Sequence, residues 1–388
     1  MYHVKTYNAI APAGLATLSD QYRVNQPQAA PDAYMIRSVD LHEHEFPASL
    51  KVIARCGAGF NNIPLDRASA AGIAVFNTPG GNANAVKELV LAMMIAANRN
   101  LIAAAEWTQQ VAAGADITLE AKKSQFNGQE IAGKKLAVIG TGHVGSLVAN
   151  AGEALGMEVV GYDPYLSVES AWNLSRNVHR AATLAEAVAG ADFVTVHVPK
   201  NEETTGMIDA GLLAQLKPTA VLLNFARLGI VDNEAAIAAL NAGRLRWYLT
   251  DFSDATIQGH PRVVILPHLG GSTVEAEANC AKLAAQELMT FLETGNVVNS
   301  VNLPNVSAPF ASDQRLTLIH QNIPNMLGQI STVIANAGIN IENLVNRSRG
   351  DYAYTMVDVA SMPPTAAEGL VATLGQIEAV SRIRLLHR

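Results

Sequence analysis

The stretch from Lys134 to Pro164 limits the possible folds of this 388-residue chain more than any other part of it. An apolar run over Leu136–Ile139 stops at the turn Gly140–Gly145, which reads GTGHVG, and a helical stretch follows directly. A second apolar run ends at Asp163, near the spacing of roughly 20 residues at which an acid is expected to bind ribose hydroxyls. A strand, a G-x-G-x-x-G turn, a helix and an acid in this order predict a dinucleotide-binding unit.

Each glycine of this turn has a physical role in such a unit. Gly140 permits the tight turn, Gly142 lets a pyrophosphate approach the backbone, and Gly145 lets the helix pack closely on the strand. The N–H groups and the dipole at the start of the helix attract the phosphates. Asp163 predicts NAD rather than NADP, because its charge repels a 2′-phosphate and no arginine follows it directly. A glycine-rich turn that serves only packing is the alternative.

Charge and composition exclude several classes of partner. The net charge is −7 and the chain has no run of Lys and Arg, so we expect no nucleic acid and no membrane partner. The N-terminus has no secretory pattern, and no apolar run is long enough to span a bilayer. The two cysteines, Cys56 and Cys280, form no CxxC motif and are expected to be reduced thiols, so we expect a cytoplasmic protein.

The residue patterns also exclude two kinds of chemistry. No cluster of His, Cys, Asp and Glu has the spacing of metal ligands, so we predict no metal. No GxSxG motif is present, which excludes a serine hydrolase of that type.

Apolar runs of strand length alternate with helical stretches, which predicts α/β units with parallel sheets. A long helix from Ala83 to about Asn100, with a second helical segment to about Ala113, separates two such regions. The expected strands are Val4–Tyr7, Ala33–Ile36, Lys51–Ala54 and Ile73–Phe76 in the first region, and Leu136–Ile139, Val159–Tyr162, Phe193–His197, Val221–Asn224, Trp247–Thr250 and Val263–Leu266 in the second. A helix over Ser272–Glu293 is expected to return to the first lobe, which is otherwise unfinished.

The C-terminal part predicts a separate small module. Asn299–Asp313 is polar, has two prolines and shows no periodicity, so we interpret it as a linker. The elements expected after it are strand Leu316–His320, helix Met326–Asn336, strands Asn340–Asn346 and Tyr352–Val359, helix Ala366–Gly375 and strand Val380–Leu386. This β-α-β-β-α-β order is typical of a ferredoxin-like module of regulatory size.

Candidate reactive side chains follow the ends of the expected strands. Arg227 and His268 each come just after a strand of the second region, on the side of the glycine turn. An arginine can bind a carboxylate bidentately, and an imidazole can move a proton near neutral pH. In the first region, Arg37 and Arg55 follow two strands and are candidate ligands of a small anionic substrate, or else surface arginines.

Seven motifs in this order resemble those of the D-isomer-specific 2-hydroxyacid dehydrogenases. They are RCGAGFNNI (55–63), TPGGNANAVKELVLA (78–92), GTGHVG (140–145), HVPKNEETTGMI (197–208), NFARLG (224–229), TDFSD (250–254) and PHLGGST (267–273). Residues 315–388 resemble an ACT domain. The resemblance implies a flavodoxin-like, discontinuous substrate domain (1–97 and 275–302), a Rossmann-type NAD domain (98–274), a linker (303–314) and an ACT regulatory domain (315–388).

The resemblance also implies a set of site residues. The catalytic residues would be Arg227 and His268, with Asp254 as the nearest substitute for a family Glu that pairs with the histidine and is missing here. The cofactor ligands would be Gly140, Gly142, His143, Val144, Gly145, Asp163, His197, Val198, Pro199, Thr204, Phe225, Ala226, Asp251 and Gly270. The substrate ligands would be Arg37, Ser38, Arg55, Gly57, Ala58, Gly59 and Asn82.

In the C-terminal module, His320, Asn322 and Asn340 match residues that contact the effector L-serine in the family. Asn325 replaces the usual glycine, and asparagine tolerates the same left-handed backbone. A module that serves only dimerisation is the alternative to serine control.

The resemblance implies NAD-dependent oxidation of 3-phospho-D-glycerate to 3-phosphooxypyruvate, the first step of serine biosynthesis, in a homodimer or homotetramer. The alternatives are a dehydrogenase for another D-2-hydroxy acid and an NAD-sensing binding protein without activity.

Overall fold

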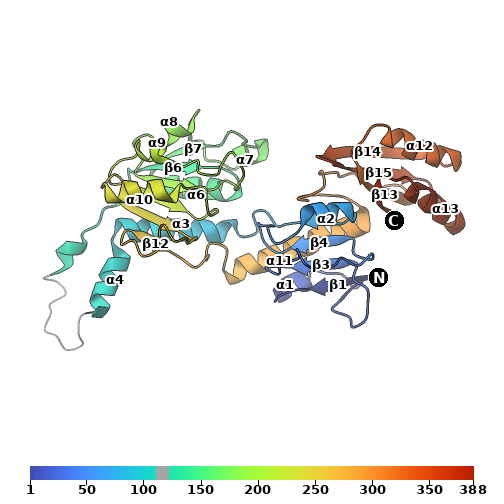
Figure 1. Cartoon of the computed structure of the whole chain (residues 1–388), viewed down its shortest axis with the longest axis horizontal. Coiled ribbons are helices and arrows are strands. Elements are labelled where there is room, and N and C mark those ends of the chain that lie inside the picture. The colour runs from blue at the N-terminus through green and yellow to red at the C-terminus, as the bar shows by residue number, and fades with distance from the viewer. Residues whose placement is uncertain (111–121) are drawn as a thin grey trace. The chain divides into compact units, whose positions relative to one another are not determined.

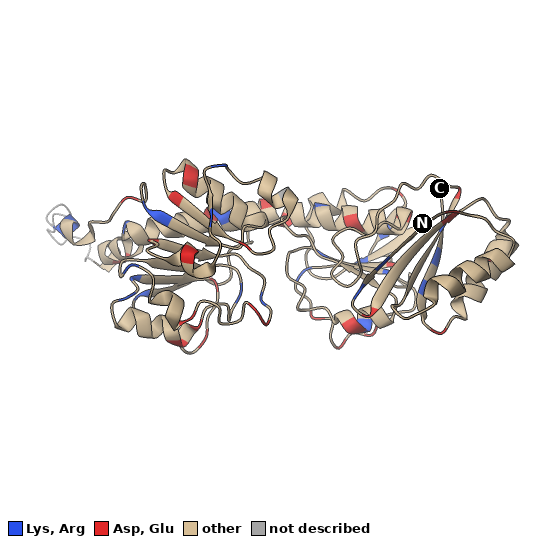
Figure 2. Cartoon of the chain, turned by 90° about the horizontal axis from the view of Figure 1, so that it is seen from above, with Lys and Arg blue, Asp and Glu red and all other residues tan. Residues whose placement is uncertain are grey.

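The computed structural model describes residues 1–110 and 122–388, so the expected end of the second helical segment near Ala113 lies outside the described residues. The chain divides into two compact units. Unit 1 contains Met1–Gly81 and Glu277–Arg388, and unit 2 contains Asn82–Ala276. Figure 1 labels the elements of both, and Figure 2 shows acidic and basic residues interspersed along the ribbons.

Unit 2 is built on a seven-stranded parallel sheet with the order β12-β11-β10-β9-β6-β7-β8. Its strands are β6 (Lys135–Ile139), β7 (Glu158–Tyr162), β8 (His179–Arg180), β9 (Phe193–Val196), β10 (Val221–Asn224), β11 (Trp247–Thr250) and β12 (Val263–Ile265). The strand order reverses between β6 and β9, which is the arrangement of a Rossmann-type sheet. The predicted doubly wound fold is therefore confirmed. Strand β8 was not predicted, because its two residues are both exposed and too few to show a strand periodicity.

Helices cover both faces of this sheet. The helices of unit 2 are α3 (Ala83–Asn98), α4 (Leu101–Gln110), α6 (His143–Ala154), α7 (Val168–Trp172), α8 (Leu184–Val188), α9 (Ala210–Leu213) and α10 (Asn233–Asn241), with a 3₁₀ turn η1 (Lys123–Phe126). Of these, α4 and η1 have no buried residue and do not cover the sheet. The buried side chains Val86, Val90 and Met94 of α3 pack against Leu136 and Val138 of β6. Because its apolar face is buried here, α3 belongs to unit 2, and the expected boundary near residue 97 moves to Gly81.

Unit 1 begins with a five-stranded parallel sheet of order β2-β1-β3-β4-β5, the flavodoxin-like order. Its strands are β1 (Tyr2–Thr6), β2 (Tyr22–Val24), β3 (Ala33–Ile36), β4 (Val52–Arg55) and β5 (Ala74–Phe76), with helices α1 (Pro12–Leu15) and α2 (Leu65–Ala70). The long helix α11 (Val274–Thr294) returns to this sheet, as predicted. Its residues Leu288 and Phe291 are buried in one core with Val52 and Phe76.

The C-terminal module of unit 1 has the predicted β-α-β-β-α-β order. Its antiparallel sheet, β14-β15-β13-β16, is compatible with an ACT module. The elements are β13 (Gln314–Gln321), α12 (Met326–Asn336), β14 (Ile341–Arg349), β15 (Tyr352–Val359), α13 (Pro364–Gly375) and β16 (Val380–His387).

The segment interpreted as a linker is instead a packed part of unit 1. The amide of Asn302 accepts a hydrogen bond from Val75 N (2.8 Å) and donates one to Ile73 O (2.9 Å), and Leu303 and Val306 are buried. Polar composition misled the prediction, because this side-chain amide pairs with the backbone beside β5 as a neighbouring strand would.

Hydrogen bonds also join the C-terminal module to the end of α11. Arg384 donates to Phe291 O (2.7 Å) and Leu292 O (3.0 Å), and the Tyr354 hydroxyl donates to Gly295 O (2.6 Å). The side chains of Tyr354 and Met356 lie in the same core as Phe291. The module and the first lobe therefore share one apolar core.

In the described part of the chain, no single helix is long and apolar enough to cross a bilayer; α3 and α4 meet the length and composition test only as a pair bent by 64°.

Candidate dinucleotide and catalytic site

The candidate residues of unit 2 gather at one edge of its sheet because the strands end in register. Ile139, Val196, Asn224, Thr250 and Ile265 lie in one row across β6, β9, β10, β11 and β12. The glycine turn and the segments that carry His197, Arg227, Asp251 and His268 all begin just beyond this row. The reversal of strand order lies between β6 and β9 in this row, and ligands bind at such a reversal in open α/β sheets.

The glycine turn has the shape that a pyrophosphate requires. Gly140 has φ +86°, and a Cβ there would lie 2.8 Å from His197 O. A Cβ on Gly145 would lie 1.8 Å from Gly140 O, so only glycine lets α6 start this close to β6. A Cβ on Gly142 would meet no atom within 4 Å in the part of the chain that the structure describes. The turn is thus closed toward the protein and open at Gly142, beside the first N–H groups of α6, where His143 and Val144 lie.

Asp163 follows β7 and is held by two backbone groups. Its Oδ2 accepts a hydrogen bond from Thr141 N in the glycine turn, and its Oδ1 accepts one from Tyr165 N, both at 2.9 Å. The carboxylate is thereby fixed beside the turn, and each oxygen retains a lone pair for a ribose hydroxyl. Thr141 was not among the predicted site residues, although its place between two of the glycines could have suggested it.

His197 lines the turn as a neutral side chain. Its Nε2 lies 2.9 Å from Thr195 Oγ1, and its backbone N donates to Ile139 O (2.7 Å). Burial lowers the pKa of His197 to about 3, which excludes it as a proton carrier at neutral pH. Val198 lies against Gly140. Thr204 accepts from Asn201 N (2.9 Å) and donates to Pro199 O (2.7 Å), so it shapes the loop.

Arg227 is a desolvated cation at the end of β10. Its Nη1 donates to Ala226 O (2.7 Å), and Asn224 holds the loop through a bond from its amide to Arg227 O (2.9 Å). Burial lowers the pKa of the Arg227 guanidinium. Among the described residues no carboxylate pairs with it, so its charge is available to an anionic ligand. Asn224, the last residue of the strand, was not among the predicted site residues. Phe225 was predicted to contact the cofactor, and its side chain is buried in the protein.

His268 stands exposed at the end of β12 on an unusual backbone. Its φ is +56°, which is uncommon for a residue with a side chain and is often found at functional sites. The ring meets Phe252 edge-on, with 5.0 Å between centroids. Asp251 holds the loop that follows, because its buried oxygens accept hydrogen bonds from Leu269 N (3.0 Å) and Gly270 N (2.6 Å).

The structure does not bring Asp254 to His268. One oxygen of Asp254 accepts from the Asn233 amide (2.5 Å), and the other accepts from Thr256 N (2.9 Å) and Ile257 N (3.3 Å). Asp254 therefore closes a local turn. The expectation that it takes the place of the missing Glu beside His268 is corrected. No acid in the described residues forms a hydrogen bond with His268, whose observed ring contact is Phe252.

The substrate candidates of unit 1 lie together after β3 and β4. Arg37 forms an ion pair with Glu277 of α11 (2.5 Å), and Arg55 Nε donates to Arg37 O (3.1 Å). A Cβ on Gly57 would lie 2.2 Å from Arg55 Nη1, so the guanidinium lies over the Gly57–Gly59 loop. Asn8 orders the loop after β3 by accepting from Ser38 N (3.0 Å). Neither Asn8 nor Glu277 was a predicted site residue.

Asn82 belongs to unit 2, where it precedes α3. A Cβ on Gly271 would lie 2.6 Å from the Asn82 amide nitrogen, so this side chain lies against the PHLGGST motif.

The three effector candidates all belong to the C-terminal module, but the structure does not bring them together there. His320 is buried, with Nε2 2.8 Å from Thr355 Oγ1 and Nδ1 2.7 Å from Gln321 O, so both ring nitrogens are occupied. Asn322 follows β13 directly, whereas Asn340 lies at the opposite end of the sheet. The role of His320 as an effector ligand stays a prediction, and in this structure its ring binds groups of the module itself. The prediction for Asn325 is confirmed, since its φ is +65°.

Residues 91–270 match the family model described as D-isomer specific 2-hydroxyacid dehydrogenase, NAD binding domain. The chain is 33% identical over 358 residues to D-3-phosphoglycerate dehydrogenase 1 of Saccharomyces cerevisiae, covering 85% of this chain and 72% of that protein. It is 32% identical over 341 residues to the D-3-phosphoglycerate dehydrogenase of Haemophilus influenzae, covering 85% and 79%. The match to the enzyme of Mycobacterium bovis is 35% identical over 319 residues but spans 57% of its length.

Solved structures share the fold. The NAD⁺-bound 3-phosphoglycerate dehydrogenase of Entamoeba histolytica superposes with a TM-score of 0.61 at 24% identity, covering 78% of this chain and 98% of that one. D-2-hydroxyisocaproate dehydrogenase gives a TM-score of 0.64 at 20% identity, covering 77% and 99%.

Proposed function

Since this chain belongs to the D-isomer-specific 2-hydroxyacid dehydrogenase family, with NAD as cofactor, we propose that it oxidises 3-phospho-D-glycerate at C2 to 3-phosphooxypyruvate, the first step of L-serine biosynthesis. One observation carries the proposal: Arg227 and His268 follow strands that end in register with the strand before the glycine turn. A carboxylate ligand and a proton acceptor are what oxidation of a 2-hydroxy acid requires beside the cofactor.

The residues of unit 2 fit the cofactor. The open side of Gly142 and the N-terminus of α6 would hold the pyrophosphate, and Asp163 would bind the adenosine ribose. The segment His197–Pro199 and the backbone of the buried residue Phe225 would lie beside the cofactor. When bound, NAD supplies the acceptor for the hydride that leaves C2.

The chain's own side chains then handle the proton and the negative charge. His268 accepts the proton of the C2 hydroxyl as the carbonyl forms, and returns it in the reverse reaction. Arg227 binds the substrate carboxylate and orients C2, because it is desolvated and has no acidic partner among the described residues. Asp251 keeps His268 in place through the backbone of Leu269 and Gly270, and it can still accept from the carboxamide of the cofactor.

We assign the ligands of the substrate phosphate and carboxylate in unit 1 to Arg37, Ser38, Arg55 and the Gly57–Gly59 loop. The guanidinium of Arg55 over the glycine loop supports this assignment, since backbone N–H groups and a guanidinium together recognise an oxyanion.

A second candidate is the oxidation of an unphosphorylated D-2-hydroxy acid by the same residues. The observation in its favour is the Arg37–Glu277 ion pair, which partly neutralises the cation expected to meet the phosphate. The two candidates differ only in the role of Arg37.

Initial rates of NADH formation with 3-phospho-D-glycerate and with D-glycerate, its matched analogue without the phosphate, test the proposal. We expect kcat/KM to be higher for the phosphorylated acid. Arg37→Gln is expected to raise KM for that acid at least tenfold and to change KM for D-glycerate little, because one charge-assisted contact is worth about a tenfold change or more. Equal effects on both acids would favour the second candidate. No NADH with any D-2-hydroxy acid would mean an NAD-binding protein without this activity.

We further propose that the C-terminal module regulates the enzyme, with L-serine as the effector and exposed Asn322 as one of its ligands. The same rates measured with and without serine test this, and unchanged rates would contradict it.

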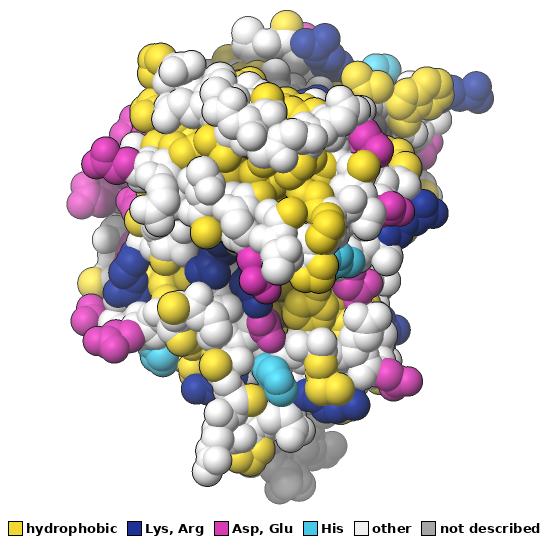
Figure 3. Space-filling view, turned by 90° about the vertical axis from the view of Figure 1, so that its right-hand side faces the viewer, with side chains coloured by type: hydrophobic (Ala, Val, Ile, Leu, Met, Phe, Trp, Pro, Cys, Tyr) yellow, Lys and Arg dark blue, Asp and Glu magenta, His cyan; other side chains and the backbone are white. Residues whose placement is uncertain are grey.

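We also propose a cytoplasmic homodimer or homotetramer. In this module Ile323 and Leu327 are exposed, and Figure 3 shows hydrophobic side chains gathered on one part of the face it draws. Light scattering of the purified chain would give its mass in solution.

A further inference from the structure

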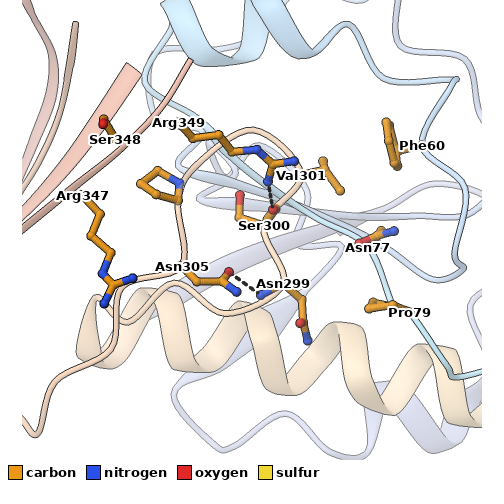
Figure 4. Close-up of a pocket in the computed structure, with 11 residues that line it drawn as sticks. Phe60, Asn77, Pro79, Asn299, Ser300, Val301, Asn305, Arg347, Ser348 and Arg349 are labelled. Carbon is orange, nitrogen blue, oxygen red and sulfur yellow. Dashed lines mark hydrogen bonds between the residues drawn. The ribbon is translucent and has the colours of Figure 1, made fainter. Parts of the chain in front are cut away.

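Unit 1 contains a cavity of about 520 Å³ between its first lobe and its C-terminal module. One wall comes from the loop after β4 and the end of β5, a second from the segment after α11, and a third from β14. Figure 4 shows Arg347 and Arg349 of β14 on one side and Asn77, Asn299 and Asn305 on the others. Neither the glycine turn nor Arg227 or His268 lines it.

The lining carries positive charge without a compensating acid. Arg347 and Arg349 lie two residues apart on one strand, so their side chains leave the same face of the sheet. Arg349 donates to a neutral group, Ser300 O (2.7 Å). Among the described residues, none forms a hydrogen bond or ion pair with the guanidinium of Arg347, and the cavity lining contains no Asp or Glu.

Amide groups add donors to the same space. Asn305 Oδ1 accepts from Asn299 N (3.0 Å), which turns the NH₂ group of Asn305 to other partners. The Asn299 amide donates to Glu287 Oε1 (3.0 Å) behind the wall. Burial raises the pKa of Glu287 to about 8, so this neighbour is largely protonated at neutral pH and does not cancel the arginine charges.

We propose that this cavity binds a small organic oxyanion, with Arg347 and Arg349 as its charged ligands. Guanidinium groups bind carboxylates and phosphates through paired N–H donors, and the amides complete the polar contacts. Phe60, Val301 and Pro304 provide apolar surface for a short carbon skeleton. The volume leaves room for an acid of three to six carbons.

The cavity is linked to the Gly57–Gly59 loop. The amide of Asn77 donates to Ala58 O (2.6 Å), and Thr78 N donates to Gly57 O (3.1 Å). A ligand that contacts Asn77 would therefore restrain this loop. Any effect of this restraint on the KM for substrate rests on the proposed function of the loop in substrate binding, whereas the binding of the oxyanion itself does not.

Isothermal titration calorimetry of the full-length chain with citrate and with inorganic phosphate tests the site. Arg347→Gln is the first variant, because Arg347 is exposed and its loss leaves the fold intact, and Arg347→Glu is the second. The matched control is Arg244→Gln, which removes an exposed arginine of unit 2 with the same change in net charge. Repeating each titration in an Arg37→Gln background weakens binding of a phosphate group at the expected substrate site and so tests whether the signal arises there.

We expect at least one of the two anions to bind the wild-type chain and the control with equal affinity. Arg347→Gln should raise its Kd about tenfold or more, and Arg347→Glu should abolish binding, in both backgrounds. Binding of citrate alone would identify a carboxylate site, and binding of phosphate alone a phosphate site. Failure of both anions to bind, or equal Kd values for wild type, Arg347→Gln and Arg347→Glu, would overturn the proposal and would leave the dehydrogenase activity untouched.

Discussion

Gly142→Ala should separate cofactor binding from folding. A Cβ at this position meets no atom of the described residues within 4 Å, so the folded state without cofactor has room for it. Gly142 precedes α6 as its N-cap, where alanine is less favourable than glycine by about 1 kcal/mol or less. A loss of that size lowers Tm by only about 2–4 °C in a unit of this length.

The same methyl group fills the space that the pyrophosphate must enter. Loss of one charge-assisted hydrogen bond between a backbone N–H and a phosphate costs roughly 1.5–3 kcal/mol. We therefore expect the Kd for NADH to rise roughly 10- to 150-fold, since each 1.4 kcal/mol is a factor of ten. Fluorescence titration with NADH gives the Kd, and calorimetry of the chain without cofactor gives Tm.

Gly145→Ala is the matched comparison. Its Cβ would lie 1.8 Å from the backbone oxygen of Gly140, which cannot yield without moving α6 away from β6. Overpacking of this kind costs about 1–3 kcal/mol, so this variant should lose Tm even without cofactor. If Gly142→Ala bound NADH within twofold of wild type, or lost as much Tm as Gly145→Ala, the assignment of Gly142 to the pyrophosphate would be refuted.

Three further predictions follow from the same contacts. His268→Ala should lower kcat about 10²-fold or more with little change in NADH affinity, and near-normal turnover would exclude His268 as the base. Asp254→Ala should lower the free energy of unfolding by about 1–2 kcal/mol through its lost turn and Asn233 contacts, with kcat unchanged; a 100-fold loss of kcat would restore it as the partner of His268. The folded chain holds a proton on Glu287 up to a pH of about 8 rather than 4.5, so its stability should fall as pH rises through that window, and Glu287→Gln should flatten the fall in a denaturant titration.

The sequence was sufficient for features that depend on local pattern. The alternation of apolar runs predicted the two parallel sheets, and the G-x-G-x-x-G turn predicted the place where strand order reverses. Val221–Asn224 and Tyr352–Val359 have the predicted bounds, because turn residues flank both runs. Asn325 was recognised as a left-handed residue from its chemistry alone.

The features that could not be predicted depend on contacts distant in sequence. Asn302 looks like a linker residue until its amide meets β5, whose residues lie more than two hundred positions earlier in the chain. Asp254 looked available to His268, but its oxygens are taken by Asn233 and the following turn. His320 matched an effector ligand by motif, yet Thr355 on the neighbouring strand binds its ring. In each case a polar side chain had several possible partners, and only the folded chain selects one.

The shared core of the first lobe and the C-terminal module has a consequence for synthesis. Unit 2 is continuous, so it can fold as soon as it leaves the ribosome. The first lobe emerges earlier but cannot close, because its core needs Phe291 of α11 and Tyr354 and Met356 of the C-terminal module, and Arg384 contacts α11. All of these residues are synthesised after unit 2. The nascent N-terminal strands therefore remain with apolar surface exposed until α11 and the C-terminal module have been synthesised, and chaperones have longer access to these strands than to unit 2.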